Sequence, residues 1–181
     1  MFLIGAMAKL DEIVELLDEE LKTSEIPDYP GAHNGLQLQN GGAITKVGAA
    51  VDASLPVIQK AIDQEVDLLL VHHGMFWQGV RPVTGAGYQK LKLAMDAGLA
   101  IYSSHIPLDV HPSLGNNILL SKKLGLKDTE SFFPWKGIEL GRKARFGGSV
   151  GELKELAVAA VGGEVLVRGE LDSPTGLVGI I

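Results

Sequence analysis

The chain has 181 residues, of which 46% are hydrophobic, so it is long enough to bury a core as one domain or as one domain and a fragment. Its 16 basic against 22 acidic residues give a net charge of −6, which argues against a basic nucleic-acid-binding surface. It has no cysteine, which excludes disulfides, thiolate metal sites and cysteine nucleophiles and leaves histidine and carboxylate side chains as the strong metal ligands.

The N-terminus MFLIGAMAKL shows no basic leader and no long apolar region before Lys9 and Asp11, so we expect no secretory signal. No apolar run approaches the roughly 18 to 20 residues that cross a bilayer. The sequence therefore predicts a cytoplasmic protein with no membrane partner.

Apolar residues recur at three- and four-residue steps over residues 7–21 and predict an amphipathic first helix. Prolines 27 and 30 follow it, and the segment DYPGAHNGLQLQNGG is rich in turn residues, which predicts a long ordered loop. Residues 46–51 predict a strand that ends at Asp52, and Ser54 is a suitable N-cap for a helix over residues 55–64.

The run DLLLV, residues 67–71, is almost continuously apolar, as in a parallel strand that is covered on both faces. A helix over residues 88–97 and a strand over residues 99–103 follow, and then a helix over residues 114–124. Two successive strand-helix units predict an α/β fold with right-handed crossovers in a parallel sheet.

After Phe132 the composition changes to glycine and charged residues, so we place a metal-binding α/β domain at 1–130 and the start of a second α/β unit at 131–181. In the second unit we expect a short helix over 151–160, a strand over 165–169, a turn at Pro174 and a strand from 176 to 181. The apolar ending LVGII suggests that this second unit is incomplete and that the chain self-associates through an exposed edge or face.

Four of the five histidines fall in two motifs, VHHGMFWQG and SSHIPLDVHPSLGNN, and each motif follows a predicted buried strand. Ligands of open α/β sheets collect beyond the carboxyl ends of the strands, so the two motifs can meet at one point. We take His72, His73 and Asp109 as metal ligands. Neighbouring residues on a strand point to opposite sides, so the two histidines suit two ions better than one, with Asp109 as a bridging carboxylate. A water between two such ions would be a nucleophile at neutral pH.

Several neighbours of these motifs have more than one interpretation. His105 could bind metal, transfer a proton, or orient Asp109; we assign it to proton transfer beside the ligands. Asp52 could face the site or bond to nearby backbone, and Asn116 and Asn117 could cap a helix or orient a substrate. Phe76 and Trp77 could form an apolar wall over the site or belong to the core. His33 and His111 are left out, because single histidines are more often simply hydrogen-bonded or exposed.

Three segments, HNGLQL at 33–38, VHHGMFWQG at 71–79 and SHIPLDVHPSLGNN at 104–117, resemble the GTP cyclohydrolase 1 type 2 homologue family, also called NIF-three-like. The resemblance spans residues 7 to about 126 and implies a NIF-three-like α/β fold, with a parallel or mixed sheet flanked by helices. It also implies a dinuclear metal centre and ring-shaped, commonly hexameric, assemblies.

By position, the paired histidines of the family fall on His72 and His73, its aspartate on Asp109, and a histidine near the centre on His105. The family takes a further His and Glu from a C-terminal motif, and this sequence has no histidine after His111. The resemblance therefore implies a family member that lacks its last portion and holds metal weakly.

Two functions remain open. One is a metal-dependent hydrolase that opens a nucleotide-like ring, acting on a small-molecule substrate that the sequence does not identify, with His105 assisting proton transfer. The other is a non-catalytic metal-binding assembly or regulatory protein. Histidine and carboxylate ligands suit divalent Zn, Mn, Fe, Co or Ni, two ions per complete site.

Overall fold

The structure is a computed structural model and describes residues 2–77 and 82–181. The chain divides into two compact units, Met1–Pro107 and Leu108–Ile181. The sequence placed this division near residue 130. Helix α5 (Asn116–Lys123) packs against α6 (Val150–Val161) and its sheet, and so belongs to the second compact unit, while the metal-binding domain over 1–130 remains a prediction.

The first unit is built on one mixed sheet of five strands in the order β1-β3-β4-β5-β2. The three central strands β3, β4 and β5 are parallel, and the two outer strands run antiparallel to their neighbours. The bounds are β1 (Phe2–Lys9), β2 (Gly35–Leu38), β3 (Ala43–Asp52), β4 (Leu68–His73) and β5 (Ala100–Ser103). Because the central strands are parallel, their carboxyl ends reach the same edge of the sheet.

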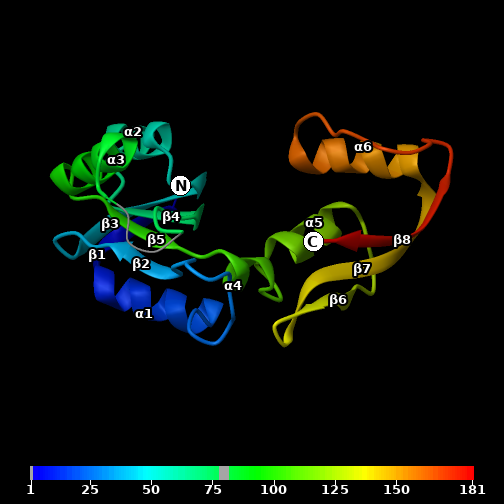
Figure 1. Ribbon diagram of the computed structural model, residues 1–181, viewed down its shortest axis with the longest axis horizontal. Helices are drawn as coiled ribbons and strands as arrows, with labels where there is room; N and C mark the ends of the chain where they lie inside the picture. The colour runs from blue at the N-terminus through cyan, green and yellow to red at the C-terminus, as the bar shows by residue number, and fades with distance from the viewer. Residues whose placement is uncertain (1, 78–81) are drawn as a thin grey trace. The chain divides into compact units, whose positions relative to one another are not determined.

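Helices cover both faces of this sheet (Figure 1). Helices α2 (Leu55–Asp63) and α3 (Gly85–Asp96) lie on one face and α1 (Leu10–Leu21) lies on the other. The core under α2 and α3 consists of aliphatic side chains that are buried: Ala53, Ile58, Ala61, Val66, Leu69, Val71, Ala94, Leu99 and Ile101. This packing fixes β4 and β5 as rigid supports for the residues at their ends.

The predicted elements of the first unit are largely confirmed, including the three central parallel strands. Ser54 occupies the N-cap position of α2, but its side chain makes no capping hydrogen bond. Two predictions differ from the structure. The first helix begins at Leu10 because residues up to Lys9 form β1, which pairs with β3. The predicted loop after Pro30 contains β2, which adds an antiparallel edge to β5.

The second unit has a three-stranded antiparallel sheet, β6 (Glu130–Trp135), β7 (Ile138–Ser149) and β8 (Pro174–Ile180), with α5 and α6 packed on it. A capping box begins α6, because Ser149 Oγ accepts the N–H of Glu152 while the Glu152 carboxylate accepts the N–H of Ser149.

Three sequence predictions for this unit need correction. The β6–β7 hairpin was not predicted, because its strands lack a regular apolar alternation. The strand predicted over 165–169 is wrong, since those residues join no sheet. Pro174 begins β8 rather than a turn, and the first residue of a strand is one of the positions where proline is tolerated.

The short helix α4 (Ile106–Asp109) stands at the junction of the two units. Gln78 and Gly79, the end of one histidine motif, lie outside the described residues. None of the helices in the described part of the chain combines the length and apolarity that a bilayer crossing needs.

Candidate metal centre

The three histidines of interest leave two neighbouring parallel strands at the same edge of the first sheet. His72 and His73 end β4, and His105 follows β5 by two residues. Val71 pairs with Ser103 in the register of these strands, so the two histidine-bearing ends lie side by side. The backbone N–H of Ser104 donates to the carbonyl of Val71 at 2.9 Å and continues this pairing beyond β5.

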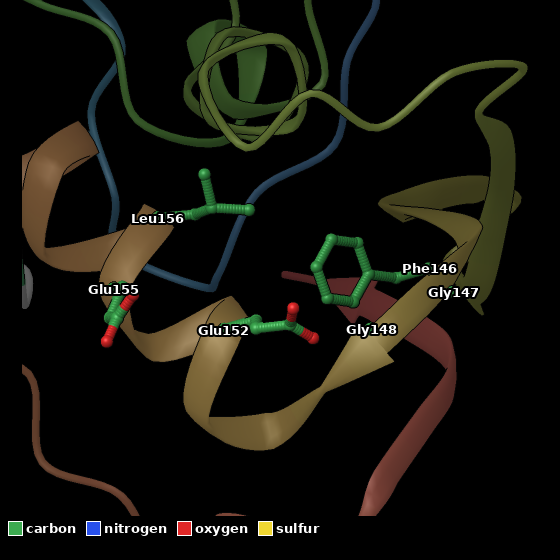
Figure 2. Close-up of a pocket in the computed structure, with 6 residues that line it drawn as sticks. All are labelled: Phe146, Gly147, Gly148, Glu152, Glu155 and Leu156. Carbon is green, nitrogen blue, oxygen red and sulfur yellow. The ribbon is translucent and has the colours of Figure 1, made fainter.

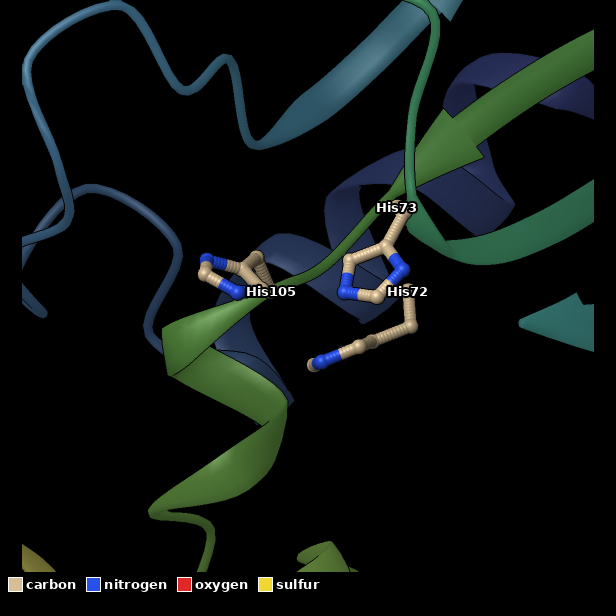
Figure 3. A group of neighbouring side chains, drawn as sticks. All are labelled: His72, His73 and His105. Atoms are coloured by element: carbon tan, nitrogen blue, oxygen red, sulfur yellow. The ribbon is translucent and has the colours of Figure 1, made fainter. Parts of the chain in front are cut away.

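The three imidazoles form one group (Figure 3). One ring nitrogen from each of His72, His73 and His105 lies within 4.8 Å of the others. The ring centroids are 4.6 Å apart for His72 and His73, 4.8 Å for His72 and His105, and 5.6 Å for His73 and His105. His72 and His73 occupy successive positions of β4, and their rings nevertheless lie close together; the interpretation that they serve two ions remains a prediction. The three ring nitrogens are therefore close enough to form a group that could hold a metal ion.

Each imidazole is oriented by a hydrogen bond at its Nδ1. His72 Nδ1 lies 3.0 Å from the carbonyl oxygen of Ser104, and His73 Nδ1 lies 2.6 Å from Asp52 Oδ1. His105 Nδ1 lies 2.9 Å from Asp28 Oδ1. All three partners are acceptors, so each Nδ1 carries the proton and Nε2 is the nitrogen left to coordinate an ion. Metal-binding histidines in proteins characteristically have such a partner.

Asp28 and Asp52 hold their histidines in different environments. The Asp28 and His105 side chains are 6% and 14% exposed, whereas those of Asp52 and His73 are 59% and 42% exposed. Burial raises the pKa of Asp28, but hydrogen bonds from Asn34, His105 and two backbone N–H groups outweigh it and hold the pKa below its usual value. Asp28 is thus a carboxylate at neutral pH, and an acceptor for the His105 ring.

Trp77 forms an aromatic wall beside the centre. Its ring meets His105 edge-on at 4.8 Å between centroids and His73 at 5.5 Å. Its indole N–H donates to the carbonyl of Gly74 at 2.9 Å, which fixes the ring over the turn that follows His73. Of the two interpretations of Trp77, the structure favours the wall over the core.

The structure places the other predicted site residues as follows. Asp109 ends α4 in the second unit, where its Oδ1 accepts a hydrogen bond from Asn116 Nδ2 at 2.8 Å; its role as a bridging ligand remains a prediction. His105, which the sequence assigned to proton transfer, stands in the same group as His72 and His73. Asp52 lies at the site through His73.

The two histidines left out have other surroundings. His33 is exposed. His111 is 8% exposed, and its Nδ1 accepts the backbone N–H of Leu114 at 3.0 Å, which closes the turn before α5. Asn117 is buried in the second unit and donates to the carbonyl of Leu140 at 2.7 Å, so its amide links α5 to β7. In the second histidine motif, His111 and Asn117 therefore have structural roles within the second unit.

Sequence reasoning missed Asp28, the partner of His105. Asp28 stands in a segment dense in turn residues and far along the chain from the histidines. The only signal for it was its position shortly before the HNGLQL motif, which the sequence left without a chemical role.

The second unit contains a cavity of about 620 Å³ between the end of β7 and α6 (Figure 2). Phe146 and Leu156 form its apolar part, and Glu152 and Glu155 bring carboxylates to it. Glu152 already accepts the N–H of Ser149 in the capping box, and the cavity is open to solvent without histidine in its lining. It therefore lacks the donor set that the histidine group provides.

The fold and the site together define an α/β protein with a mixed sheet and a three-histidine group able to hold a metal ion at the carboxyl edge of its parallel strands. The chain belongs to the Duf34/NIF3 (NGG1p interacting factor 3) family, whose family model matches residues 8–179.

Relatives of known sequence carry a common description. The chain is 42% identical over 131 residues to the GTP cyclohydrolase 1 type 2 homolog of Deinococcus radiodurans, covering 72% of this chain and 49% of that protein. It is 43% identical over 136 residues to the protein of the same description from Pyrococcus abyssi, covering 75% and 54%. The chain thus spans about half the length of the curated relatives that it matches.

Solved structures share the fold. The crystal structure of TTHA1606 from Thermus thermophilus matches with a TM-score of 0.80 at 35% identity, over 93% of this chain and 69% of that one. The protein ybgI, described as of unknown function, matches with a TM-score of 0.84 at 30% identity, over 95% and 68%. Reduced HcgD from Methanocaldococcus jannaschii matches with a TM-score of 0.72 at 31% identity, over 85% and 60%. The predicted family and fold class are confirmed.

Proposed function

We propose that the chain is a metal-binding protein whose histidine group holds a divalent transition ion, and that the complete centre is dinuclear and hydrolytic. The observation that carries the proposal is the convergence of His72, His73 and His105, with ring nitrogens within 4.8 Å of one another. Each ring also has an acceptor at Nδ1, so the group is oriented before any ion arrives.

The donor set narrows the choice of ion. Imidazole nitrogens with a nearby carboxylate suit Zn, Mn, Fe, Co or Ni, and the absence of cysteine disfavours thiolate-type sites. When bound, such an ion supplies Lewis-acid chemistry and lowers the pKa of a water. The test of this part is elemental analysis of protein purified and dialysed without chelator, compared with the His72→Ala, His73→Ala double variant. Loss of the metal in the variant supports the site, and equal content in both proteins contradicts it.

For the dinuclear centre we assign Asp109 as the bridging ligand. For hydrolysis His105 is the proposed proton-transfer group, a role in which its Nε2 exchanges the metal for a proton, because one lone pair cannot serve both at once. The family relationship and the description of the relatives as GTP cyclohydrolase 1 type 2 homologs support this assignment. Ring-shaped, hexameric self-association is proposed on the same ground. A small molecule with a hydrolysable ring is the proposed substrate, acted on beside the Trp77 wall.

The alternative is a non-catalytic metal-binding assembly or regulatory protein. A catalytic ion keeps an open coordination position, whereas a structural ion is enclosed by protein ligands. Adding azide to the Co²⁺-loaded protein therefore separates the two. A change in the visible Co²⁺ spectrum indicates an open position and favours the hydrolase. An unchanged spectrum favours the non-catalytic alternative.

A further inference from the structure

Residues of the HNGLQL motif and of the segment just before it form hydrogen bonds to His105 and its neighbour, and the proposed function assigns these residues no role. Asp28 and Asn34 belong to the segment between α1 and β2, yet both bond to the start of α4. Asn34 Oδ1 accepts the N–H of His105 at 2.8 Å, and Asp28 Oδ2 accepts the N–H of Ile106 at 3.1 Å. The two side chains also bond to each other, since Asn34 Nδ2 donates to Asp28 Oδ2 at 2.8 Å.

The Asp28 carboxylate therefore has a full set of donors, and their arrangement is specific. Its Oδ2 receives Asn34 Nδ2 and the N–H of Ile106, while its Oδ1 receives the N–H of Tyr29 at 2.6 Å and the ring of His105 at 2.9 Å. An ionised carboxylate only accepts hydrogen bonds, so it selects the His105 tautomer that has its proton on Nδ1. In that tautomer Nε2 has a lone pair and can act as a ligand or as a base.

We infer that Asp28 is a positioning residue that holds His105 in the Nδ1–H tautomer and in the orientation of the histidine group, with Asn34 fixing the backbone of the same residue. This inference rests on the proposed function, because it assigns a purpose to the ligand nitrogen of that site. This role of Asp28 differs from a general stabilising role, because it determines which nitrogen of the His105 ring carries the proton.

The Asp28→Asn substitution distinguishes control of the His105 tautomer from a general stabilising role of Asp28. Two fixed donors, Asn34 Nδ2 and the N–H of Ile106, face Oδ2, whereas Oδ1 has one fixed donor, the N–H of Tyr29, and the His105 ring. The amide oxygen of the variant is therefore expected at Oδ2, and the amide NH₂ then faces His105 Nδ1 and loses the bond to Tyr29. An NH₂ group donates to that nitrogen and moves the ring proton to Nε2, which removes the ligand lone pair. We expect the affinity for Zn²⁺ to fall about 10- to 100-fold, the range for loss of such a partner.

Two further variants serve as controls. Asn34→Ala removes the bond to the backbone of His105 and one of the donors to Asp28 Oδ2, but leaves the carboxylate in contact with the His105 ring, so it should lower the unfolding temperature with the tautomer unchanged. Asp67→Asn alters a carboxylate with a similar set of donors, Thr45 N, Thr45 Oγ1 and Lys46 N, just before the first residue of β4. Because the histidines end β4, this control should change stability but not Zn²⁺ affinity.

The experiment is ¹⁵N NMR of histidine-labelled, metal-free protein near pH 8, together with Zn²⁺ titration in competition with a chelator. The inference predicts an Nδ1–H signal for His105 in the wild type and an Nε2–H signal in Asp28→Asn. It also predicts that Asp28→Asn binds Zn²⁺ more weakly than the wild type, whereas Asp67→Asn binds it equally well. An Nε2–H signal in the wild type, or an unchanged tautomer in Asp28→Asn, overturns it. If the wild type binds no Zn²⁺, the proposed function fails, and the tautomer measured without metal still decides the role of Asp28.

Discussion

His73 Nδ1 lies 2.6 Å from Asp52 Oδ1, and this pair joins the end of β4 to the end of β3, where the two residues face each other in the parallel register. Both side chains are well exposed, unlike those of His105 and Asp28. Water can therefore replace the Asp52 carboxylate as an acceptor for the His73 ring, but it cannot easily replace that of Asp28.

The first prediction follows from this difference in exposure. Asp52→Asn should weaken Zn²⁺ binding by less than about 10-fold, the low end of the range for the loss of a histidine partner. Asp28→Asn should weaken it more. Chelator-competition titrations of the two variants under the same conditions check the order, and a larger effect at Asp52 would contradict it.

The second prediction concerns Gly74, which directly follows the paired histidines. The Gln37 side chain lies across it, with its Cδ only 2.6 Å from the position of an added Cβ, and Gln37 Oε1 accepts the N–H of Met75 at 2.6 Å. Gly74→Ala should displace Gln37, loosen the turn after His73 and lower both Zn²⁺ affinity and the unfolding temperature.

Gly87→Ala is the matched control, since Gly87 lies in α3 with open space around it. Alanine is favoured over glycine in a helix by about 1 kcal/mol, so this variant should be as stable as the wild type or more so. Equal Zn²⁺ binding by the Gly74 variant and this control would show that the turn does not support the centre.

The third prediction concerns Tyr102, whose side chain is 1% exposed and joins β5 to α1. Its hydroxyl donates to Asp18 Oδ1 at 2.7 Å and lies 2.8 Å from Thr23 Oγ1. Tyr102→Phe leaves both partners without this bond, so we expect a loss of about 1 to 3 kcal/mol in the free energy of unfolding. Urea denaturation at pH 7 measures it, and a variant as stable as the wild type would contradict the role of the hydroxyl.

The fourth prediction concerns how the difference in free energy of unfolding between the wild type and Tyr102→Phe depends on pH. Burial raises the pKa of Tyr102, and the hydrogen bond and charge of Asp18 raise it too, against a lowering by Thr23. The stabilisation by Tyr102 is therefore complete below about pH 10, where tyrosine is neutral in both states, and declines as pH rises toward the folded pKa. The gap between wild type and Tyr102→Phe should shrink by about 1.4 kcal/mol per pH unit above pH 10. A constant gap from pH 8 to pH 11 would disagree with this.

The fifth prediction tests the bridging ligand. An amide at position 109 can still accept the hydrogen bond from Asn116 Nδ2, so Asp109→Asn should keep a thermal transition close to that of the wild type. It removes a negative charge and a good bridging group, so the metal content should fall. Unaltered metal content with a normal thermal transition would reject the role of Asp109.

The parts of the fold that the sequence predicts are those with strong local patterns. The apolar run before His72 indicates a buried parallel strand, and β4 is that strand. β2 was missed because turn residues surround it, and its pairing with β5 depends on a partner far along the chain. The β6–β7 hairpin was missed for a similar reason, since glycine and charged residues break the alternation in β7.

The same reasoning applies to the site. His72, His73 and His105 could be found because each follows a recognisable strand. Asp28 could not, because it is separated from His105 by 77 residues and only the folded segment brings the two together. The close approach of the His72 and His73 rings could not be predicted either, because strand alternation sets the direction of each Cα–Cβ bond but not where a ring turns beyond it.

The central claim is that three histidines at the edge of one sheet hold a metal ion. Zn²⁺ titration of metal-stripped protein tests it most directly, with His72→Ala, His73→Ala and His105→Ala compared with His33→Ala, a histidine whose side chain is exposed and outside the group. We predict that each of the three substitutions weakens Zn²⁺ binding by more than about 100-fold, beyond the range for losing only a histidine partner, and that His33→Ala binds as the wild type does. Wild-type affinity in all four variants would contradict the assignment of the metal centre to these histidines.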